Sequence, residues 1–126
     1  MARLSFPGSG GVELVADQLG DPDHPPVLFL PGAGQSRHVW GEAAAALVAA
    51  GRSAVLLDLR GAGDSGGSPA ADAATLVEDL RAVLAGLPAR PVVVAAPLGG
   101  ALALAALGEA SVPLASALVV ADPPGL

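Results

Sequence analysis

The stretch VVVAAPLGGALALAAL, residues 92–107, joins three consecutive valines to a Pro-Leu-Gly-Gly turn and a run of small apolar residues. A continuous apolar run, in contrast to an alternating one, is typical of a strand that is buried on both faces. Residues 99–110 are apolar around the circumference of a helix, so we expect that helix to be enclosed by the protein. The stretch therefore predicts a buried strand, a sharp turn marked by glycine, and a buried helix.

Three further apolar runs have the same character as the valines. They are VLFL at residues 27–30, AVLL at residues 54–57 and LVV at residues 118–120. Residues 40–48 and 76–87, which lie between successive runs, carry apolar residues at helical spacing. Strand and helix therefore alternate from residue 27 onward, and right-handed crossovers between the strands predict a parallel sheet.

The two helices between the runs carry start and stop signals. Ser36 is a candidate N-cap for the first helix, and Gly51 follows its end. Thr75 and Glu78 have the spacing of a capping box at the start of the second helix. These signals delimit two amphipathic helices that would pack against the sheet.

The N-terminal region predicts an antiparallel hairpin, because RLSF at residues 3–6 and VELVAD at residues 12–17 flank the turn sequence PGSGG. The sequence shows neither an internal repeat nor a domain linker. We therefore expect one α/β domain over residues 1–126, with a mostly parallel sheet preceded by a hairpin. The long polar loop at residues 60–73 follows a strand, and ligand clefts in open α/β sheets form at the carboxyl ends of strands.

Composition restricts the chemistry. The chain is 52% hydrophobic but only 2% aromatic, so its core must consist of Ala, Val and Leu. The net charge is −6, and the six basic residues are all arginines scattered along the chain, which argues against binding to nucleic acid. The absence of Cys, with only two histidines, argues against a metal site. We expect neither a metal nor another cofactor.

Residues 1–17 lack the continuous apolar segment of a signal peptide, so we expect a cytoplasmic protein. A small membrane protein is the alternative, since Glu109 is the one charge between residues 91 and 121. Pro97 and the Gly99-Gly100 pair interrupt that run, and no Trp or Tyr belt flanks it. These features disfavour a membrane-spanning helix.

Four segments in order resemble the α/β-hydrolase superfamily, in particular its esterase and epoxide-hydrolase-like branch. They are LPGAGQSRHVW at residues 30–40, LLDLRGAGDSGGS at residues 56–68, VVVAAPLGG at residues 92–100 and ALVVADPP at residues 117–124. The resemblance covers residues 12–126. It implies the N-terminal part of an α/β-hydrolase core, incomplete at its C-terminal edge, and a family chemistry of ester or epoxide hydrolysis on small apolar substrates.

The resemblance also assigns candidate oxyanion-hole donors. Where the family usually has His-Gly, this chain has Pro31-Gly32, and the backbone N–H of Ala33 follows. The backbone N–H of Leu98, just after the expected nucleophile, would be the second donor. A backbone donor requires no particular side chain. The alternative is that residues 31–34 form only a tight turn.

The nucleophile itself is missing. The family motif Gly-x-Ser-x-Gly aligns with residues 95–99, which places Pro97 at the position of the serine. Proline has no hydroxyl, and its φ near −65° is incompatible with the strained tip of a nucleophile elbow. Pro97 suits the first residue of a helix, so we expect the turn to persist in a relaxed form.

The remaining members of a triad are also in doubt. Asp122 is a weak candidate for the acid, with a cap at the sheet edge as the other interpretation. His24 and His38 both precede residue 97, whereas the family base follows it, and we expect both to lie on the surface. Residues 58–65 resemble a family segment, Asp-x-Arg-Gly-x-Gly-x-Ser, that lies beside the active site. Asp58, Asp64 and Ser65 in this segment carry oxygens that could serve as an acid or a nucleophile, but we expect them to be turn and capping groups.

We therefore expect a hydrolase-family chain that is catalytically incompetent alone. The alternatives are a binding or interaction module that keeps the cleft, and one part of a split hydrolase. The expected ligand is small, apolar and ester- or epoxide-like. The strand at residues 117–121 should form an uncovered sheet edge, through which the chain would associate with itself or with a complementing second chain.

Overall fold

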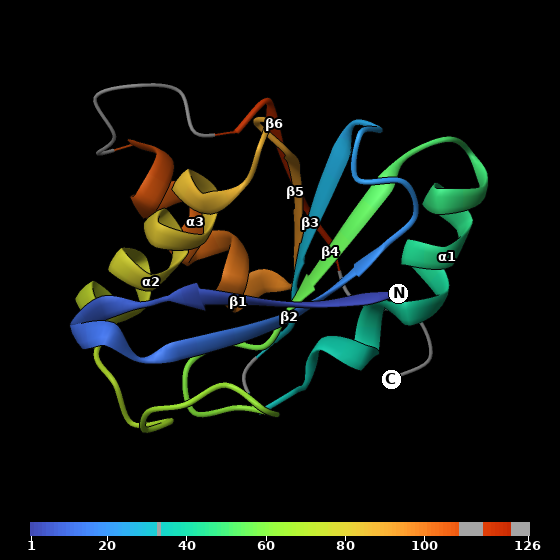
Figure 1. The fold of residues 1–126 in the computed structure, drawn as a ribbon. Coiled ribbons are helices and arrows are strands. Elements are labelled where there is room, and N and C mark those ends of the chain that lie inside the picture. The colour runs from blue at the N-terminus through green and yellow to red at the C-terminus, as the bar shows by residue number, and fades with distance from the viewer. Residues whose placement is uncertain (33, 109–114, 122–126) are drawn as a thin grey trace.

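A computed structural model describes residues 1–32, 34–108 and 115–121. Its described elements surround one mixed sheet (Figure 1). The strands are β1 (Ala2–Pro7), β2 (Glu13–Leu19), β3 (Pro26–Leu30), β4 (Ser53–Leu57), β5 (Val92–Ala95) and β6 (Ala117–Val120). The α-helices are α1 (Gly41–Ala49), α2 (Ala73–Gly86) and α3 (Pro97–Gly108), and two short 3-10 turns are η1 (Ser9–Gly11) and η2 (Arg37–Trp40).

The strand order in the sheet is β1-β2-β4-β3-β5-β6. Strand β3 lies at the centre and is parallel to β4 on one side and to β5 on the other, and β6 continues the parallel part at the edge. Strands β1 and β2 form an antiparallel hairpin, and β2 pairs antiparallel with β4. The predicted hairpin and the predicted parallel sheet are both confirmed.

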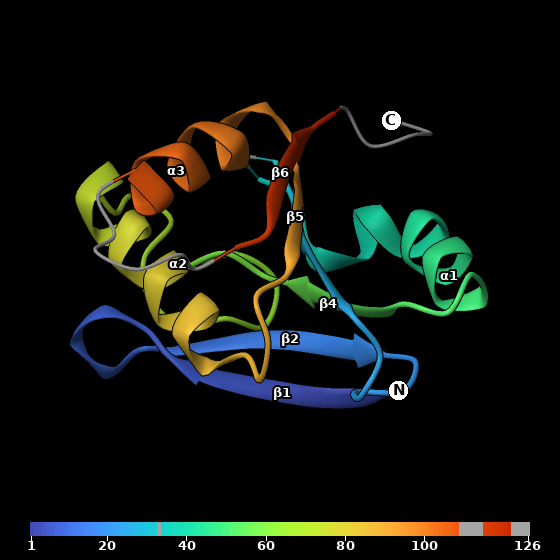
Figure 2. The same cartoon turned by 90° about the horizontal axis from the view of Figure 1, so that it is seen from above.

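Helices cover both faces of the sheet, which explains the continuous apolar strands. Figure 2 shows α1 on one face and α2 with α3 on the other. Along β3, Leu28 and Leu30 belong to the core under α2 and α3, whereas Val27 and Phe29 belong to the core under α1. Phe29 packs against the Trp40 ring with centroids 5.7 Å apart. Successive side chains of one strand thus fill two separate cores.

The prediction that the third helix is enclosed is wrong. Leu102, Ala103 and Ala106 of α3 are buried, but Leu104 is 63% exposed. The helix packs on β5, β6 and α2 from one side, and the described residues place nothing over its other side. A helix that is apolar all round carries no signal that says which of its faces is covered.

The predicted helix starts also need correction. Asp72, not Thr75, caps α2, because its carboxylate accepts a hydrogen bond from the backbone N–H of Thr75 at 2.9 Å. Glu78 instead accepts a hydrogen bond from the Ser9 hydroxyl at 2.8 Å. Ser36 precedes η2 and makes no capping hydrogen bond with its side chain, and α1 begins only at Gly41. Gly51 follows the end of α1 as predicted, with a φ of 93°.

The uncharged run at residues 91–121 is divided between β5, α3 and β6. None of the helices in the described ranges has the length and apolarity that crossing a membrane requires.

Candidate functional site

A cleft of about 370 Å³ lies beyond the carboxyl ends of β3 and β4. It is formed by the loop that follows β3, the loop that follows β4, and the beginning of α2. Its lining residues are Gly32, Gly34, Gln35, Ser36, Leu59, Arg60, Gly61, Ala62, Gly63, Pro69 and Leu76. This is the edge at which open α/β sheets bind ligands, as the position of the polar loop predicted.

The turn from β5 to α3 is an ordinary helix start. Pro97 is the first residue of α3 and is exposed, and the backbone N–H of Gly100 donates to the Ala96 carbonyl at 2.8 Å. No residue other than glycine has a positive φ in the part of the chain that the structure describes. The expectation of a relaxed turn with Pro97 at the helix start is therefore confirmed, and a strained elbow is not formed there.

The loop after β3 closes as a tight turn next to the helix start. The Gln35 backbone N–H donates to the Gly32 carbonyl at 3.1 Å, and the Gln35 side-chain oxygen accepts from the Gly32 N–H at 2.8 Å. A β-carbon on Gly32 would lie 3.5 Å from that of Ala96, which brings this loop beside the start of α3. Gly34 adopts a φ of 71°.

Of the two candidate oxyanion-hole donors, the structure describes only one. Ala33 lies outside the described residues. Leu98 is the second residue of α3, and the first N–H groups of a helix have no acceptor within the helix itself. The role of both as donors stays a prediction, and Asp122, the candidate acid, also lies outside the described residues.

Asp58, directly after β4, is fully buried and its carboxylate is occupied. It accepts hydrogen bonds from the backbone N–H of Arg37 at 2.6 Å and of Asp64 at 2.9 Å, and from the Arg37 guanidinium. Ser65 is equally engaged, since its hydroxyl donates to the Asp58 carbonyl at 2.7 Å and accepts from the Val15 N–H at 2.8 Å. These groups have the structural roles that the sequence predicted.

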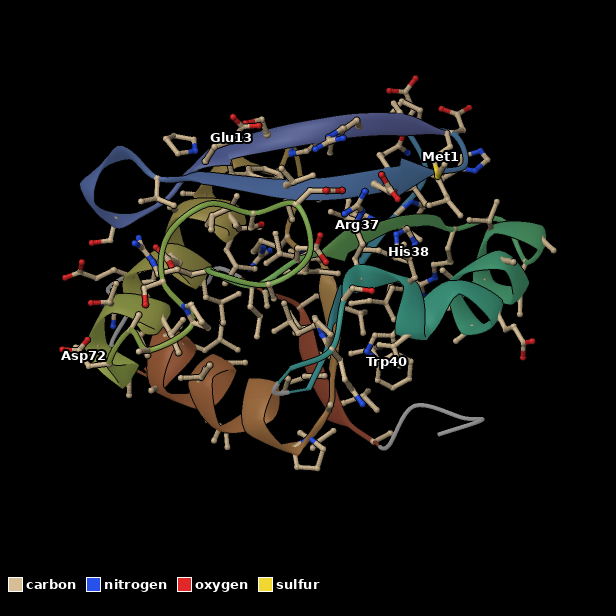
Figure 3. The ribbon with its side chains drawn as sticks, turned by 90° about the horizontal axis from the view of Figure 1, so that it is seen from below. Met1, Glu13, Arg37, His38, Trp40 and Asp72 are labelled. Atoms are coloured by element: carbon tan, nitrogen blue, oxygen red, sulfur yellow. The ribbon has the colours of Figure 1, made fainter. Side chains whose placement is uncertain are left out.

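Arg37 holds three carboxylates together, and sequence reasoning did not single it out. Its Nε lies 3.0 Å from Asp17 Oδ2, in an ion pair that lacks hydrogen-bond alignment, and its Nη1 contacts Asp58 and, at 3.0 Å, Asp64. Figure 3 shows Arg37 beside β2 and the loop that follows β4. Burial by itself would lower the pKa of this guanidinium, but the carboxylate contacts raise it above its ordinary value. The arginine therefore stays charged and fastens η2 to both segments.

Arg60 forms a second ion pair beneath the cleft. Its Nε and Nη2 donate to the two carboxylate oxygens of Asp79 on α2 at 2.8 and 2.9 Å, and Nη2 also donates to the Ser9 carbonyl at 2.6 Å. The Ser9 backbone N–H donates to the same carboxylate at 2.8 Å. The hydrogen bonds to Asp79 raise the pKa of Arg60 above its ordinary value. This arrangement joins the cleft loop, α2 and the hairpin.

The histidines are not assembled into a catalytic group. His24 is exposed in the turn before β3, with its Nε2 3.7 Å from Asp21 Oδ2. His38 is exposed in η2, and none of the hydrogen bonds found among the described residues joins it to Ser36. Both were expected on the surface. Within the described ranges, His, Asp and Glu side chains form no cluster that could hold a metal ion.

Known proteins share this architecture. A solved α/β hydrolase from Sphaerobacter thermophilus is 28% identical, with a TM-score of 0.80, and the match covers 96% of this chain and 45% of that protein. An epoxide hydrolase from Vigna radiata is 25% identical, with a TM-score of 0.83 over 99% and 41% of the two chains. An esterase from a Rhodococcus species is 27% identical, with a TM-score of 0.82 over 95% and 45%.

The chain thus spans less than half the length of these solved structures. No curated protein sequence matches it significantly. The family model described as the alpha/beta hydrolase fold matches residues 25–125, in agreement with the resemblance drawn from the four sequence segments. The chain therefore belongs to the alpha/beta hydrolase fold family.

Proposed function

We propose that this chain is a non-hydrolytic member of its family, a pseudoenzyme that does not cleave esters or epoxides by itself and keeps its cleft as a binding site for a small apolar ligand. The observation that carries the proposal is Pro97 at the position of the nucleophile, where it begins α3 in ordinary helical geometry. Ester hydrolysis through a covalent intermediate requires an activated nucleophile and an adjacent base. Proline supplies neither an attacking oxygen nor the elbow geometry.

The other oxygen-bearing groups near the cleft support the same conclusion. Asp58 and Ser65 make hydrogen bonds that a nucleophile would have to give up. Ser36 lines the cleft, but a serine hydroxyl is a weak nucleophile at its free pKa, and His38 is exposed. Residues 98–126 contain no histidine.

The cleft supports a binding role. Leu59, Leu76 and Pro69 supply apolar contact, and the glycine-rich loops bring backbone groups close to the space between them. Small-molecule sites are commonly concave, mainly apolar and furnished with a few polar groups. The esterase and the epoxide hydrolase among the similar structures make an ester- or epoxide-like ligand the first class to test. A cytoplasmic location remains a prediction within this proposal.

The catalytic half of the proposal is tested with purified chain on nitrophenyl acetate, nitrophenyl butyrate and styrene oxide. We expect no hydrolysis above that of a heat-denatured sample. Turnover that survives purification to homogeneity, and that disappears when one residue of this chain is changed, would contradict the proposal.

The binding half uses the fluorescence of Trp40, the single tryptophan. Its indole N–H donates to the carbonyl of Leu30, where the cleft loop begins, at 2.9 Å. Phenyl acetate and styrene oxide are expected to change the emission in a saturable way. Ala62→Phe, which fills the cleft, should abolish this change, whereas Ala45→Phe on the exposed side of α1 should not. Absence of saturation with both compounds would argue against a binding role.

A further inference from the structure

The two walls of the cleft are joined by Arg37. The first wall is the loop that follows β3, whose last lining residue is Ser36, and the second is the loop that follows β4, which lines the cleft with residues 59–63. Arg37 comes directly after the first wall. Its guanidinium contacts the carboxylates of Asp58 and Asp64, the two residues that flank the lining stretch of the second wall. One side chain therefore spans both walls.

Buried groups fix Arg37 from the side of the sheet. Its carboxylate partners Asp17, on β2, and Asp58, just after β4, have side chains that are only 9% and 0% exposed. The Arg37 Nε lies 3.0 Å from Asp17 Oδ2, and the Arg37 backbone N–H donates to Asp58 Oδ1 at 2.6 Å. Separating a buried cation from either carboxylate would leave a charge unpaired in the interior, which is strongly unfavourable. The sheet thus holds Arg37 in place.

Asp64 is the exposed partner of Arg37. Its side chain is 52% exposed, and its Oδ2 lies 3.0 Å from Arg37 Nη1. Because water can hydrate this carboxylate when the contact opens, the opening costs little free energy. Arg3 on β1, with its Nη2 3.8 Å from the same oxygen, and His38 on η2 also act electrostatically on Asp64. The contact with Asp64 can therefore open and close while the two buried contacts stay closed.

The second wall is a tight turn that Asp64 ties to Arg37. The Ala62 backbone N–H donates to the Leu59 carbonyl at 3.0 Å, and the Asp64 backbone N–H donates to the Asp58 carboxylate at 2.9 Å. These bonds shape the turn itself, whereas the Asp64 side chain connects it to the guanidinium. Neither Arg37 nor Asp64 belongs to the lining residues of the cleft. Both would therefore act on a ligand through the wall and not by contact.

We infer that Arg37 and Asp64 are positioning residues whose ion pair sets the distance between the two walls of the cleft. When the pair is closed, the second wall is held against the first, and the cleft keeps the width that suits a small ligand. When it opens, the turn at residues 59–63 moves away from the first wall and its contacts with the ligand are lost. The part of this inference that concerns affinity rests on the proposed binding role. The part that concerns the walls does not.

Asp64→Ala tests the inference, because it removes an exposed partner and leaves the buried contacts of Arg37 intact. Amide hydrogen exchange of the full chain, without ligand, is followed by NMR at the N–H groups of Gln35 in the first wall and Ala62 in the second, both of which donate within turns. We expect both to exchange about fivefold faster or more in the variant. The Gly51 N–H, in the turn after α1, is the internal reference and should be unchanged.

Two variants serve as controls. Arg3→Ala removes the other arginine beside Asp64 but leaves the contact between the walls, so the exchange of Gln35 and Ala62 should match that of the wild type. Asp64→Glu keeps a carboxylate within reach of Arg37 and should also exchange as the wild type does. A general loss of stability would instead accelerate exchange at the reference amide as well.

Ligand affinity is the second readout. The wild type and the same three variants are titrated with phenyl acetate, with the emission of Trp40 as the signal. Binding by Asp64→Ala should be about fivefold weaker or more. Arg3→Ala and Asp64→Glu should bind as the wild type does, which a role of Asp64 in stability alone would not produce.

Three outcomes would overturn the inference. One is that Asp64→Ala leaves the exchange of Ala62 unchanged. Another is that Arg3→Ala accelerates this exchange as much as Asp64→Ala does. The third is that phenyl acetate binds the wild type and Asp64→Ala equally well. If the wild type binds no phenyl acetate, the proposed binding role fails, and hydrogen exchange still decides whether the ion pair holds the two walls together.

Discussion

Gly63 lies directly against the buried carboxylate of Asp58, so that a β-carbon at residue 63 would come closer than 3 Å to both carboxylate oxygens. Gly63 also has a φ of 52°, in the region that favours glycine. The loop after β4 can fold over Asp58 only because this side chain is missing. The carboxylate against which this cleft loop packs is also an ion-pair partner of Arg37, so the conformation of the loop depends on that ion pair.

We expect Gly63→Ala to lower the free energy of unfolding by about 2 to 4 kcal/mol, since it combines a left-handed backbone with a steric clash. Gly10→Ala is the matched control, because Gly10 has a φ of 70° with no atom within 4 Å of the added carbon. The control should cost only about 1 to 2 kcal/mol, from the backbone conformation. Urea denaturation measures both, and equal losses would show that the Asp58 contact is unimportant.

Arg37→Met should destabilise the chain by about 3 to 5 kcal/mol, because it leaves the carboxylates of Asp17 and Asp58 buried without a cation. The triple variant with Asp17→Asn and Asp58→Asn removes that uncompensated charge. The triple variant should regain part of the lost stability. The part regained measures the repulsion between the unpaired carboxylates, and the part not regained measures the packing lost with the arginine side chain. Urea denaturation at neutral pH gives the comparison, and a single variant as stable as the wild type would contradict this account.

Asp64 gives the ion-pair cluster a pH dependence. The hydrogen bond from Arg37, followed by the charge of Arg3, holds the pKa of Asp64 below its ordinary value of 3.8. A carboxylate with a lowered pKa in the folded state stabilises the fold above its ordinary pKa, and this contribution is lost as the pH falls through the lowered value. We expect Asp64→Asn to be less stable than the wild type above pH ~4 and to converge with it at lower pH. Thermal unfolding across pH 2 to about 7 tests this, and a constant difference would contradict it.

The strands could be predicted most directly where β3 and β4 are buried on both faces, so that almost every residue in them had to be apolar. The hairpin was equally readable from PGSGG between two short apolar runs. The exposure of Leu104 could not be predicted, because nothing in an all-apolar helix distinguishes a covered face from an open one. The cap at Asp72 was missed because Thr75 and Glu78 have the spacing of a capping box. In the structure Asp72 accepts the hydrogen bond from the Thr75 N–H, and Glu78 instead binds the hydroxyl of Ser9, which is distant in sequence.

The candidate site likewise has one part that the sequence could predict and one part that it could not. The helix start at Pro97 could be predicted because proline is well suited to the first position of a helix. The role of Arg37 could not be predicted, since its partners Asp17, on β2, and Asp58, just after β4, are brought together only by the folded sheet. An arginine in a short turn looks like any surface arginine until those neighbours are known.

The final prediction concerns Pro97→Ser. If the missing hydroxyl alone accounted for the proposed lack of hydrolysis, this substitution would create activity. A serine needs an adjacent base, however, and no histidine follows residue 97 in this chain. Partial triads keep only the residual rate that binding and oxyanion contacts provide. We therefore expect nitrophenyl ester hydrolysis by Pro97→Ser to remain near that of the control Pro97→Ala.

Combining Pro97→Ser with a co-expressed C-terminal hydrolase polypeptide supplies both missing elements, the hydroxyl and a histidine from the added half. That combination should be far more active than either change alone, because nucleophile and base act as a unit and their effects are not additive. Measuring the wild type and Pro97→Ser, each with and without the added polypeptide, on one ester panel gives all four rates. Strong activity from the single substitution would mean that a base is already present, with His38 the first residue to replace.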